Sequence, residues 1–504
     1  MLAQKTVMEA VPIHTLALEP LLAVMGSRRT TRILAAVEHA RATLHGRTIW
    51  HINSTARGGG VAEMLQTMLA YERGAGLDVR WFVMDGDAPF FALTKRLHHR
   101  LHGEPGDDGT LGAAERRHYD QVTQRNVGAL LAAVKPDDIV VLHDPQTAGL
   151  APQLRDAGAM VLWRCHIGID RLNTNTEEAW QFLQPYIETA DTRIFSRAAY
   201  IPPSIAMLPV SVIPPAIDAL SPKNQPLSAA TVRVMLRHIG LLAGTVNGQR
   251  YRLPETFFTV NGVGSDIGAR ILQTQPLPSP STPLIVQVSR WDPLKDMAGV
   301  MRGFASRREK LGNAHLALVG PDPSGVTDDP EGAHVYDECV ALWHALPPDA
   351  RERIHLVCLS MTNIEENALI VNAIQRFATV VVQKSLQEGF GLTVTEALLK
   401  GRPVVASRVG GIQDQITDGT HGLLLDDPTD PHAFGDAVAR LLGDPVLAKY
   451  LARNARRRAI AEFLAPRQMM QMFDLIHGLN GSNSLLSSDV LYDAVPTTTH
   501  KVKD

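Results

Sequence analysis

TVVVQKSLQEGFGLTVTEA, residues 379–397, reads as a strand, a glycine-containing turn and a helix, which together form the repeating unit of a parallel α/β sheet. Gly389 and Gly391 stand at the predicted helix start, where unpaired backbone N–H groups and the helix dipole favour an anion. Glu388 lies in the turn and Glu396 in the helix, so both carboxylates can reach a ligand bound there. The alternative is that Glu388 only caps the helix and Glu396 faces solvent; the two glycines favour the ligand site.

The same alternation of strands and helices runs through both halves of the chain and predicts two parallel sheets with helices on both faces. In the second half, apolar runs predict strands at Leu284–Ser289, His315–Val319, Ile354–Cys358, Thr379–Gln383 and Pro403–Ala406. In the first half, strands are predicted at Arg47–Asn53, Val79–Met84, Asp138–His143 and Met160–His166, with helices at Val61–Ala75, Ala113–Val134 and Glu177–Thr189.

Composition shifts divide the chain into four parts. We predict a first Rossmann-like domain over residues 1–218 and a second over 283–480. Residues 219–282 are rich in Ser, Pro and Gly, which indicates an interdomain connection with one short helix at Ala230–Leu241. The polar, aperiodic tail 481–504 is predicted to be disordered.

Bulk composition excludes several classes of partner. The 504 residues carry 49 basic and 52 acidic side chains, a net charge of −3, which suits neither a nucleic acid nor a membrane surface. The three cysteines are widely spaced and fit neither a disulfide framework nor a zinc site. With no apolar run long enough to span a membrane and no signal peptide at the N-terminus, we expect a cytoplasmic protein.

SRWDPLKD, residues 289–296, is a second candidate site because it follows the first strand of the second half. Arg290 and Lys295 lie at a strand-to-helix turn, at the carboxyl edge of the sheet where ligands of such folds bind. Two cations there can neutralise a diphosphate and stabilise it as a leaving group. A solvated basic turn is the alternative.

Two further candidates lie in the first half. STARGGGV, residues 54–61, joins a strand to a helix with three glycines and can approach a phosphate closely, or can be only a tight turn. His166 ends one predicted strand, and Asp144 and Gln146 follow the strand before it. These side chains can line a pocket, although His166 can equally be a satisfied core residue and Asp144 a helix cap.

Taken together, these motifs resemble the retaining glycosyltransferases of family four. The resemblance rests on EGFGLTVTEA (388–397), RPVVASRVGGIQDQI (402–416) and SRWDPLKD, and it covers roughly residues 45–218 and 283–478. A narrower resemblance links WHINSTARGGGVAEML (50–65), the segment 81–102, WRCHI (163–167) and IPPAIDALSPKN (213–224) to glycosyltransferring trehalose synthases and to retaining trehalose phosphorylases.

The resemblance implies a GT-B fold, in which two Rossmann-like domains face each other across a cleft, with residues 1–218 on the acceptor side and residues 283–480 binding the nucleotide sugar. It implies catalytic roles for His166, Arg290, Lys295 and Glu388. It implies acceptor contacts for Asp144 and Gln146, and donor contacts for Gly59, Gly60, Arg290, Lys295, Glu388, Gly389, Phe390, Gly391, Leu392 and Glu396.

The resemblance implies transfer with retention of the anomeric configuration. No carboxylate stands as an obvious nucleophile beneath the sugar, so the departing diphosphate oxygen would take the proton of the acceptor on the same face. This scheme needs leaving-group stabilisation and positioning, with no tightly bound cofactor and no divalent metal. The histidines show no ligand spacing such as HExxH.

Three functions remain open. The first is synthesis of trehalose from a nucleoside diphosphate glucose and glucose. The second is phosphorolysis of trehalose, or glycosyl transfer to another acceptor. The third is a catalytically silent binder of sugar nucleotides, which the full set Gly58–Gly60, His166, Arg290, Lys295, Glu388 and Glu396 argues against. The expected partners are small-molecule sugars, and the resemblance leaves a homodimer open.

Overall fold

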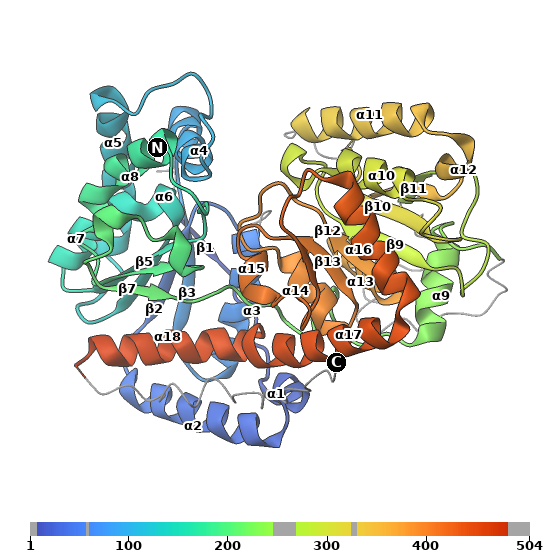
Figure 1. The fold of residues 1–504 in the computed structure, drawn as a ribbon. Helices are drawn as coiled ribbons and strands as arrows, with labels where there is room; N and C mark the ends of the chain where they lie inside the picture. The colour runs from blue at the N-terminus through green and yellow to red at the C-terminus, as the bar shows by residue number, and fades with distance from the viewer. Residues whose placement is uncertain (1–7, 57–59, 245–268, 324–329, 482–504) are drawn as a thin grey trace, which may run out of the picture. The chain divides into compact units, whose positions relative to one another are not determined.

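The computed structural model describes residues 8–56, 60–244, 269–323 and 330–481 of the chain (Figure 1). It divides into two compact units: unit 1 contains Met1–Ala216 and Ala461–Asp504, and unit 2 contains Ile217–Ile460. Among the described residues, each unit holds one seven-stranded sheet. None of the helices within the described ranges is both long and apolar enough to cross a membrane.

The sheet of unit 1 has the strand order β1-β3-β2-β4-β5-β6-β7. The first strand runs antiparallel to β3, and all other neighbours are parallel. Its four predicted strands are present as β2 to β5, whereas the sequence patterns missed the short strands β1, β6 and β7. The strands are β1 (Met8–Val11), β2 (Ile49–Asn53), β3 (Val79–Met84), β4 (Ile139–His143), β5 (Met160–Cys165), β6 (Thr192–Phe195) and β7 (Val210–Val212).

Helices cover both faces of this sheet. On one face, Trp50, Leu142 and Trp163 pack into a core with Phe90 and Tyr119 from the helices α4 and α5. The opposite face is covered by α3, and the C-terminal helix α18 packs against α2 and α3. The helices of unit 1 are α1 (Glu19–Met25), α2 (Ser27–Thr43), α3 (Gly60–Gly74), α4 (Ala88–Leu101), α5 (Ala113–Leu131), α6 (Asp144–Thr147), α7 (Ala151–Asp156), α8 (Thr174–Ile187) and α18 (Ala465–Leu479).

The sheet of unit 2 has the order β14-β13-β12-β9-β10-β11-β8, parallel except for β8, which runs antiparallel to β11. All five strands predicted in this half are present. The strands are β8 (Ala269–Leu272), β9 (Leu284–Val288), β10 (His315–Pro321), β11 (Ile354–Leu359), β12 (Val380–Gln383), β13 (Val404–Ser407) and β14 (Leu423–Leu425).

The helices of unit 2 place a second apolar core against this sheet, in which Trp291, Phe304 and Tyr336 are buried. The helices are α9 (Ala229–His238), α10 (Met297–Ser306), α11 (Pro330–Ala345), α12 (Pro348–Arg351), α13 (Ile364–Phe377), α14 (Leu392–Leu399), α15 (Ile412–Gln415), α16 (Pro431–Gly443) and α17 (Pro445–Glu462), the last of which ends at the boundary between the units.

The unit boundaries differ from the predicted domain boundaries at two places. Helix α18 belongs to unit 1 although the sequence placed it in the second domain, because its apolar side chains Met469 and Phe473 are buried in unit 1. The predicted connection contributes β8 and α9 to unit 2, where α9 packs against α13. Residues 245–268 of that connection and the tail 482–504 lie outside the described residues.

Candidate active site

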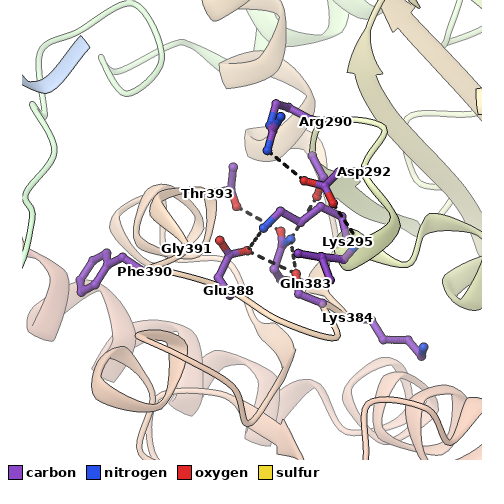
Figure 2. A network of polar contacts seen from close by, with 12 residues as sticks. Arg290, Asp292, Lys295, Gln383, Lys384, Glu388, Phe390, Gly391 and Thr393 are labelled. Carbon is purple, nitrogen blue, oxygen red and sulfur yellow. Dashed lines mark hydrogen bonds and ion pairs between the residues drawn. The ribbon is translucent and has the colours of Figure 1, made fainter. Parts of the chain in front are cut away.

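Glu388 and Lys295 form an ion pair at the carboxyl end of the sheet of unit 2. Lys295 ends the turn η5 (Pro293–Lys295) after β9, and Glu388 lies in the loop between β12 and α14. The two strands are parallel neighbours, so the segments that follow them meet at one edge. Nζ of Lys295 lies 2.9 Å from Oε2 of Glu388, and the Ser385 hydroxyl donates to the same oxygen at 3.3 Å (Figure 2). The side chains are only 16% and 12% exposed, so the pair is partly desolvated.

The loop that carries Glu388 is anchored by a buried glutamine. Gln383 ends β12, and its Nε2 donates to the hydroxyls of Ser289 and Ser385, each at 3.0 Å. Its Oε1 accepts a hydrogen bond from the Thr393 hydroxyl at 3.1 Å (Figure 2). One amide therefore joins the end of β9, the loop and the first turn of α14.

A second, more buried ion pair supports the same loop. Lys384 is 1% exposed, and its ammonium donates to the carboxylate of Asp296. Asp296 also caps α10, because its Oδ1 accepts from the backbone N–H of Gly299 at 3.0 Å. Sequence reasoning missed this pair; the only signal was a lysine directly after an apolar strand, where a charged side chain needs a partner.

The start of α14 is shaped by Gly391. This residue is the N-cap of the helix at φ 85°, a left-handed conformation that favours glycine. A Cβ at this position would lie 3.1 Å from Cγ1 of Ile412 and 3.2 Å from Cγ of Glu388. The side chain of Gln415, at the end of α15, fixes the backbone that leads into α14: its Nε2 donates to the carbonyls of Phe390 at 2.6 Å and of Gly391 at 3.2 Å. Glycine at the cap leaves the first N–H groups of the helix without a side-chain cap, as an anion site requires.

The remaining donor-site candidates of unit 2 differ in their surroundings. Arg290 is 68% exposed and donates to Asp292 at 2.9 Å (Figure 2). Glu396 is buried, which is contrary to the solvent-facing alternative, and its Oε2 accepts from Gln375 at 3.4 Å. The Phe390 side chain is buried and lies apart from the polar network (Figure 2). Gly389 and Leu392 are partly buried beside Glu388 and at the first position of α14.

The candidates of unit 1 gather at the carboxyl ends of β4 and β5. His166 directly follows β5, and its backbone N–H donates to Oδ1 of Asp144 at 2.7 Å. Asp144 opens α6 at φ 63°, and burial raises the pKa of its carboxyl to about 7. The carboxylate therefore secures the backbone of His166 rather than capping a helix, and its predicted contact with an acceptor sugar stays a prediction. Gln146, on α6, is partly exposed.

The glycine-rich turn is described only in part. Gly60 is the first residue of α3, and a Cβ built there would meet nothing within 4 Å. Gly59, with Arg57 and Gly58, lies outside the described residues. The phosphate role of this turn therefore stays a prediction.

The candidates thus form two groups: Gly60, Asp144, Gln146 and His166 in unit 1, and Arg290, Lys295, Glu388–Leu392 and Glu396 in unit 2. Within the described part of the chain, no group of three or more His, Cys, Asp or Glu side chains is arranged to hold a metal ion.

Two Rossmann-like sheets, each with its candidates at the carboxyl ends of parallel strands, form the GT-B fold. Solved structures share this fold. The match to sucrose-phosphate synthase from Thermosynechococcus elongatus covers 87% of this chain and 100% of the synthase, with a TM-score of 0.57 and 19% identity. A UDP-forming trehalose-phosphate synthase from Burkholderia vietnamiensis matches 86% of this chain and 99% of its own, with a TM-score of 0.58 and 15% identity.

The chain belongs to the trehalose synthase family. A trehalose synthase from Rubrobacter xylanophilus is 37% identical over 441 residues, which cover 87% of this chain and 92% of the relative. One from Pyrococcus horikoshii is 32% identical over 465 residues, 92% and 97% of the two chains. The trehalose synthase N-terminal domain family matches residues 51–202, and the glycosyl transferases group 1 family matches residues 359–458.

A more distant relative is a trehalose phosphorylase from Pleurotus pulmonarius. It is 26% identical over 435 residues, which cover 81% of this chain but only 54% of the phosphorylase. The predicted fold, class of enzyme and family are therefore confirmed, whereas the roles of the individual site residues stay predictions.

Proposed function

We propose that this glycosyltransferase joins glucose from a nucleoside diphosphate glucose to free glucose and forms trehalose with retention at the transferred anomeric carbon. The observation that carries the proposal is the partly buried Lys295–Glu388 pair, 2.9 Å apart, beside the glycine-capped start of α14. A cation, a carboxylate and a helix start without a side-chain cap at one sheet edge suit a ligand that combines a diphosphate with a sugar.

The diphosphate is the group that this edge stabilises. As the bond from the sugar carbon to the phosphate oxygen breaks, negative charge builds up on the departing diphosphate. Lys295, the exposed Arg290 and the N-terminus of α14 supply positive potential for that charge, which lowers the barrier. Glu388 accepts hydrogen bonds from hydroxyls of the donor glucose, and Lys295 balances its charge. Glu396 binds the donor ribose.

Retention follows from attack on the face that the diphosphate leaves. The new bond forms between the anomeric carbon and an acceptor hydroxyl oxygen, and the proton of that hydroxyl passes to the departing phosphate oxygen. His166 lies beside the donor sugar in this scheme, and Asp144 and Gln146 contact the acceptor. The bond formed, the bond broken and the transferred proton are all accounted for without a divalent metal. Removing metal ions with EDTA is therefore expected to leave the rate unchanged.

Synthesis is favoured over phosphorolysis by the extent of the similarity. The chain covers 92% of the Rubrobacter trehalose synthase and only 54% of the Pleurotus phosphorylase, so nearly half of the phosphorylase has no counterpart in the matched region.

A donor and acceptor screen tests the proposal. Purified protein is given ADP-, UDP- or GDP-glucose, each with and without glucose, and the release of nucleoside diphosphate is followed. We expect release with at least one donor that depends on added glucose. If glucose gives no release, other sugars are added in its place, and release with one of them would make that sugar the acceptor instead of glucose. No release with any donor, together with glucose 1-phosphate formed from trehalose and phosphate, would replace the synthase by a phosphorylase.

A further inference from the structure

Three histidines lie in a row on one face of the sheet of unit 1. His51 on β2 pairs in register with Val141 on β4, so His143, two residues further along β4, points to the same face. His143 in turn pairs with Arg164 on β5, and His166 follows two residues later. The row therefore crosses three adjacent strands from the middle of β2 to the candidate site at the end of β5.

The imidazoles of this row are hydrogen-bonded end to end. Nδ1 of His51 lies 3.0 Å from Nε2 of His143, and Nδ1 of His143 lies 3.0 Å from Nε2 of His166. The rings are stacked, with interplanar angles of 25° and 13°. His51 and His143 are each 1% exposed, whereas His166 is partly exposed, so only the last ring can meet a ligand.

A buried carboxyl stands at the inner end of the row. Glu72 on α3 is 2% exposed, and its Oε2 lies 3.8 Å from Nε2 of His51, beyond hydrogen-bond distance. This oxygen is buried and makes no hydrogen bond within the described part of the chain. Burial raises the pKa of Glu72 to about 8, an effect that the cation of Arg164 partly offsets. Near neutral pH the carboxyl is therefore protonated, and it lies beside the imidazole of His51.

The proton order along such a row has only two forms. Burial lowers the pKa of His51 to about 3 and those of His143 and His166 well below the ordinary value, so each ring is neutral and carries one N–H. If the protonated Glu72 closes the 3.8 Å gap and donates to Nε2 of His51, every ring must donate from Nδ1, and Nδ1–H of His166 faces outward. If Glu72 is ionised, every ring donates from Nε2 toward Glu72, and His166 presents an acceptor.

We propose that Glu72, His51 and His143 form a buried relay that fixes His166 as a hydrogen-bond donor, through Nδ1–H, to the donor sugar or its phosphate. The three residues of the relay are positioning residues, because they act on the ligand only through His166. The assignment of that ligand rests on the proposed function, whereas the relay itself does not.

The relay predicts how activity depends on pH. Arg164 from β5 is the cation that acts on Glu72 and on all three histidines. Asp144 from α6 contacts the row by accepting a hydrogen bond from the backbone N–H of His166. Helix α18, which packs against α3, brings the uncharged Gln468 toward Met64 and Met68. As pH rises past the pKa of Glu72, one proton is lost and the three ring protons move from Nδ1 to Nε2. His166 then changes from donor to acceptor, and turnover is expected to fall above about pH 8.

The tautomer of His166 in the full-length protein is the first test. Histidine labelled with ¹⁵N is incorporated, and the His166 signals are identified by their loss in His166→Gln. We expect a protonated Nδ1 and an unprotonated Nε2 near neutral pH, the reverse of the tautomer that free histidine prefers. A protonated Nε2, or a ring protonated at both nitrogens, would overturn the relay.

The pH profile of Glu72→Gln is the second test. The glutamine amide donates to His51 at every pH, so the alkaline fall of turnover is expected to disappear. His355→Phe is the matched control: it breaks another buried, stacked pair, in which His315 and His355 lie 2.9 Å apart in unit 2. This control is expected to keep both the His166 tautomer and the alkaline fall. A fall that persists in Glu72→Gln, or a wild-type profile flat well above pH 8, contradicts the proposal.

The two proposals fail separately. The tautomer measurement needs no substrate, so a donor Nδ1–H on His166 without trehalose formation would leave the relay standing and reject the proposed function. Trehalose formation with the opposite tautomer would do the reverse.

Discussion

At the scale of single residues, the account depends most on Glu388, which we assign to the hydroxyls of the donor sugar. Glu388→Gln keeps the shape of the side chain but removes the charge that pairs with Lys295. We expect turnover to fall about 10²–10³-fold, the range seen when one preorganised polar contact to a reacting group is lost. Initial rates measure the effect, and circular dichroism confirms an intact fold. Near-normal turnover would remove Glu388 from the donor site.

The diphosphate assignment is tested by binding. Arg290→Ala combined with Lys295→Ala is expected to weaken the binding of a nucleoside diphosphate by more than about tenfold, or ~1.4 kcal/mol. The double variant removes the two positive charges that the proposal places beside the diphosphate. Isothermal titration calorimetry measures the affinity. Lys449→Ala, which removes an exposed cation elsewhere in unit 2, is the control and should leave it unchanged. Equal affinities of the double variant and the control would contradict the assignment.

Sequence reasoning found the residues of this site that lie in linear motifs. Glu388 and Lys295 were predicted because each lies in a turn between a strand and a helix, and the structure brings them together. The relay was missed because its members are far apart in the sequence and are joined only by strand register. His51 in particular reads as one polar residue in an apolar strand, and nothing near it in the chain indicates its partners.

At the scale of elements, the start of α14 requires a left-handed residue. Gly391→Ala should reduce the free energy of unfolding by about 1–2 kcal/mol, because an alanine at positive φ is strained and its Cβ would crowd Ile412. Gly389→Ala is the matched control, since a Cβ there meets nothing within 4 Å. Denaturant unfolding of both variants measures the difference. Equal stabilities would show that the conformation of Gly391 is not what shapes the helix start.

The buried pair under the loop gives a second prediction at this scale. Asp296→Asn keeps an oxygen to cap α10 but leaves the ammonium of Lys384 buried without a counter-charge. We expect a loss of about 3 kcal/mol of unfolding free energy. Asp436→Asn, which changes an exposed pair with Arg307, should alter the unfolding midpoint little. If both variants behave alike, the Lys384–Asp296 pair does not support the loop.

Whether the sequence predicted a strand depends on the length of that strand and on its position in the sheet. The central strands β4 and β10 are buried on both faces, so they read as continuous apolar runs. The edge strand β8 has four residues, is only partly buried and is followed by the Ser/Pro-rich segment 275–283, so no period marks it.

At the scale of the whole molecule, the chain returns to unit 1 at its C-terminal end. The amphipathic pattern of α18 predicts a helix but does not say which sheet it covers, and the structure packs it against α2 and α3. Arg467 fixes its start by donating to the carbonyl of Pro214 at 3.0 Å. A chain that stops after Ile460 is therefore expected to lose protection from hydrogen exchange in α2 and α3 while α10 in unit 2 keeps it. Unchanged protection in α2 and α3 would contradict the assignment of α18 to unit 1.

The central claim is the transfer of glucose to glucose with retention, and NMR of the product tests it most directly. The protein is incubated with the nucleoside diphosphate α-glucose that supports turnover and with uniformly ¹³C-labelled glucose. The account predicts α,α-trehalose in which one ring is labelled and the other is not. A β-linkage to the unlabelled ring, or a disaccharide other than trehalose, would contradict it.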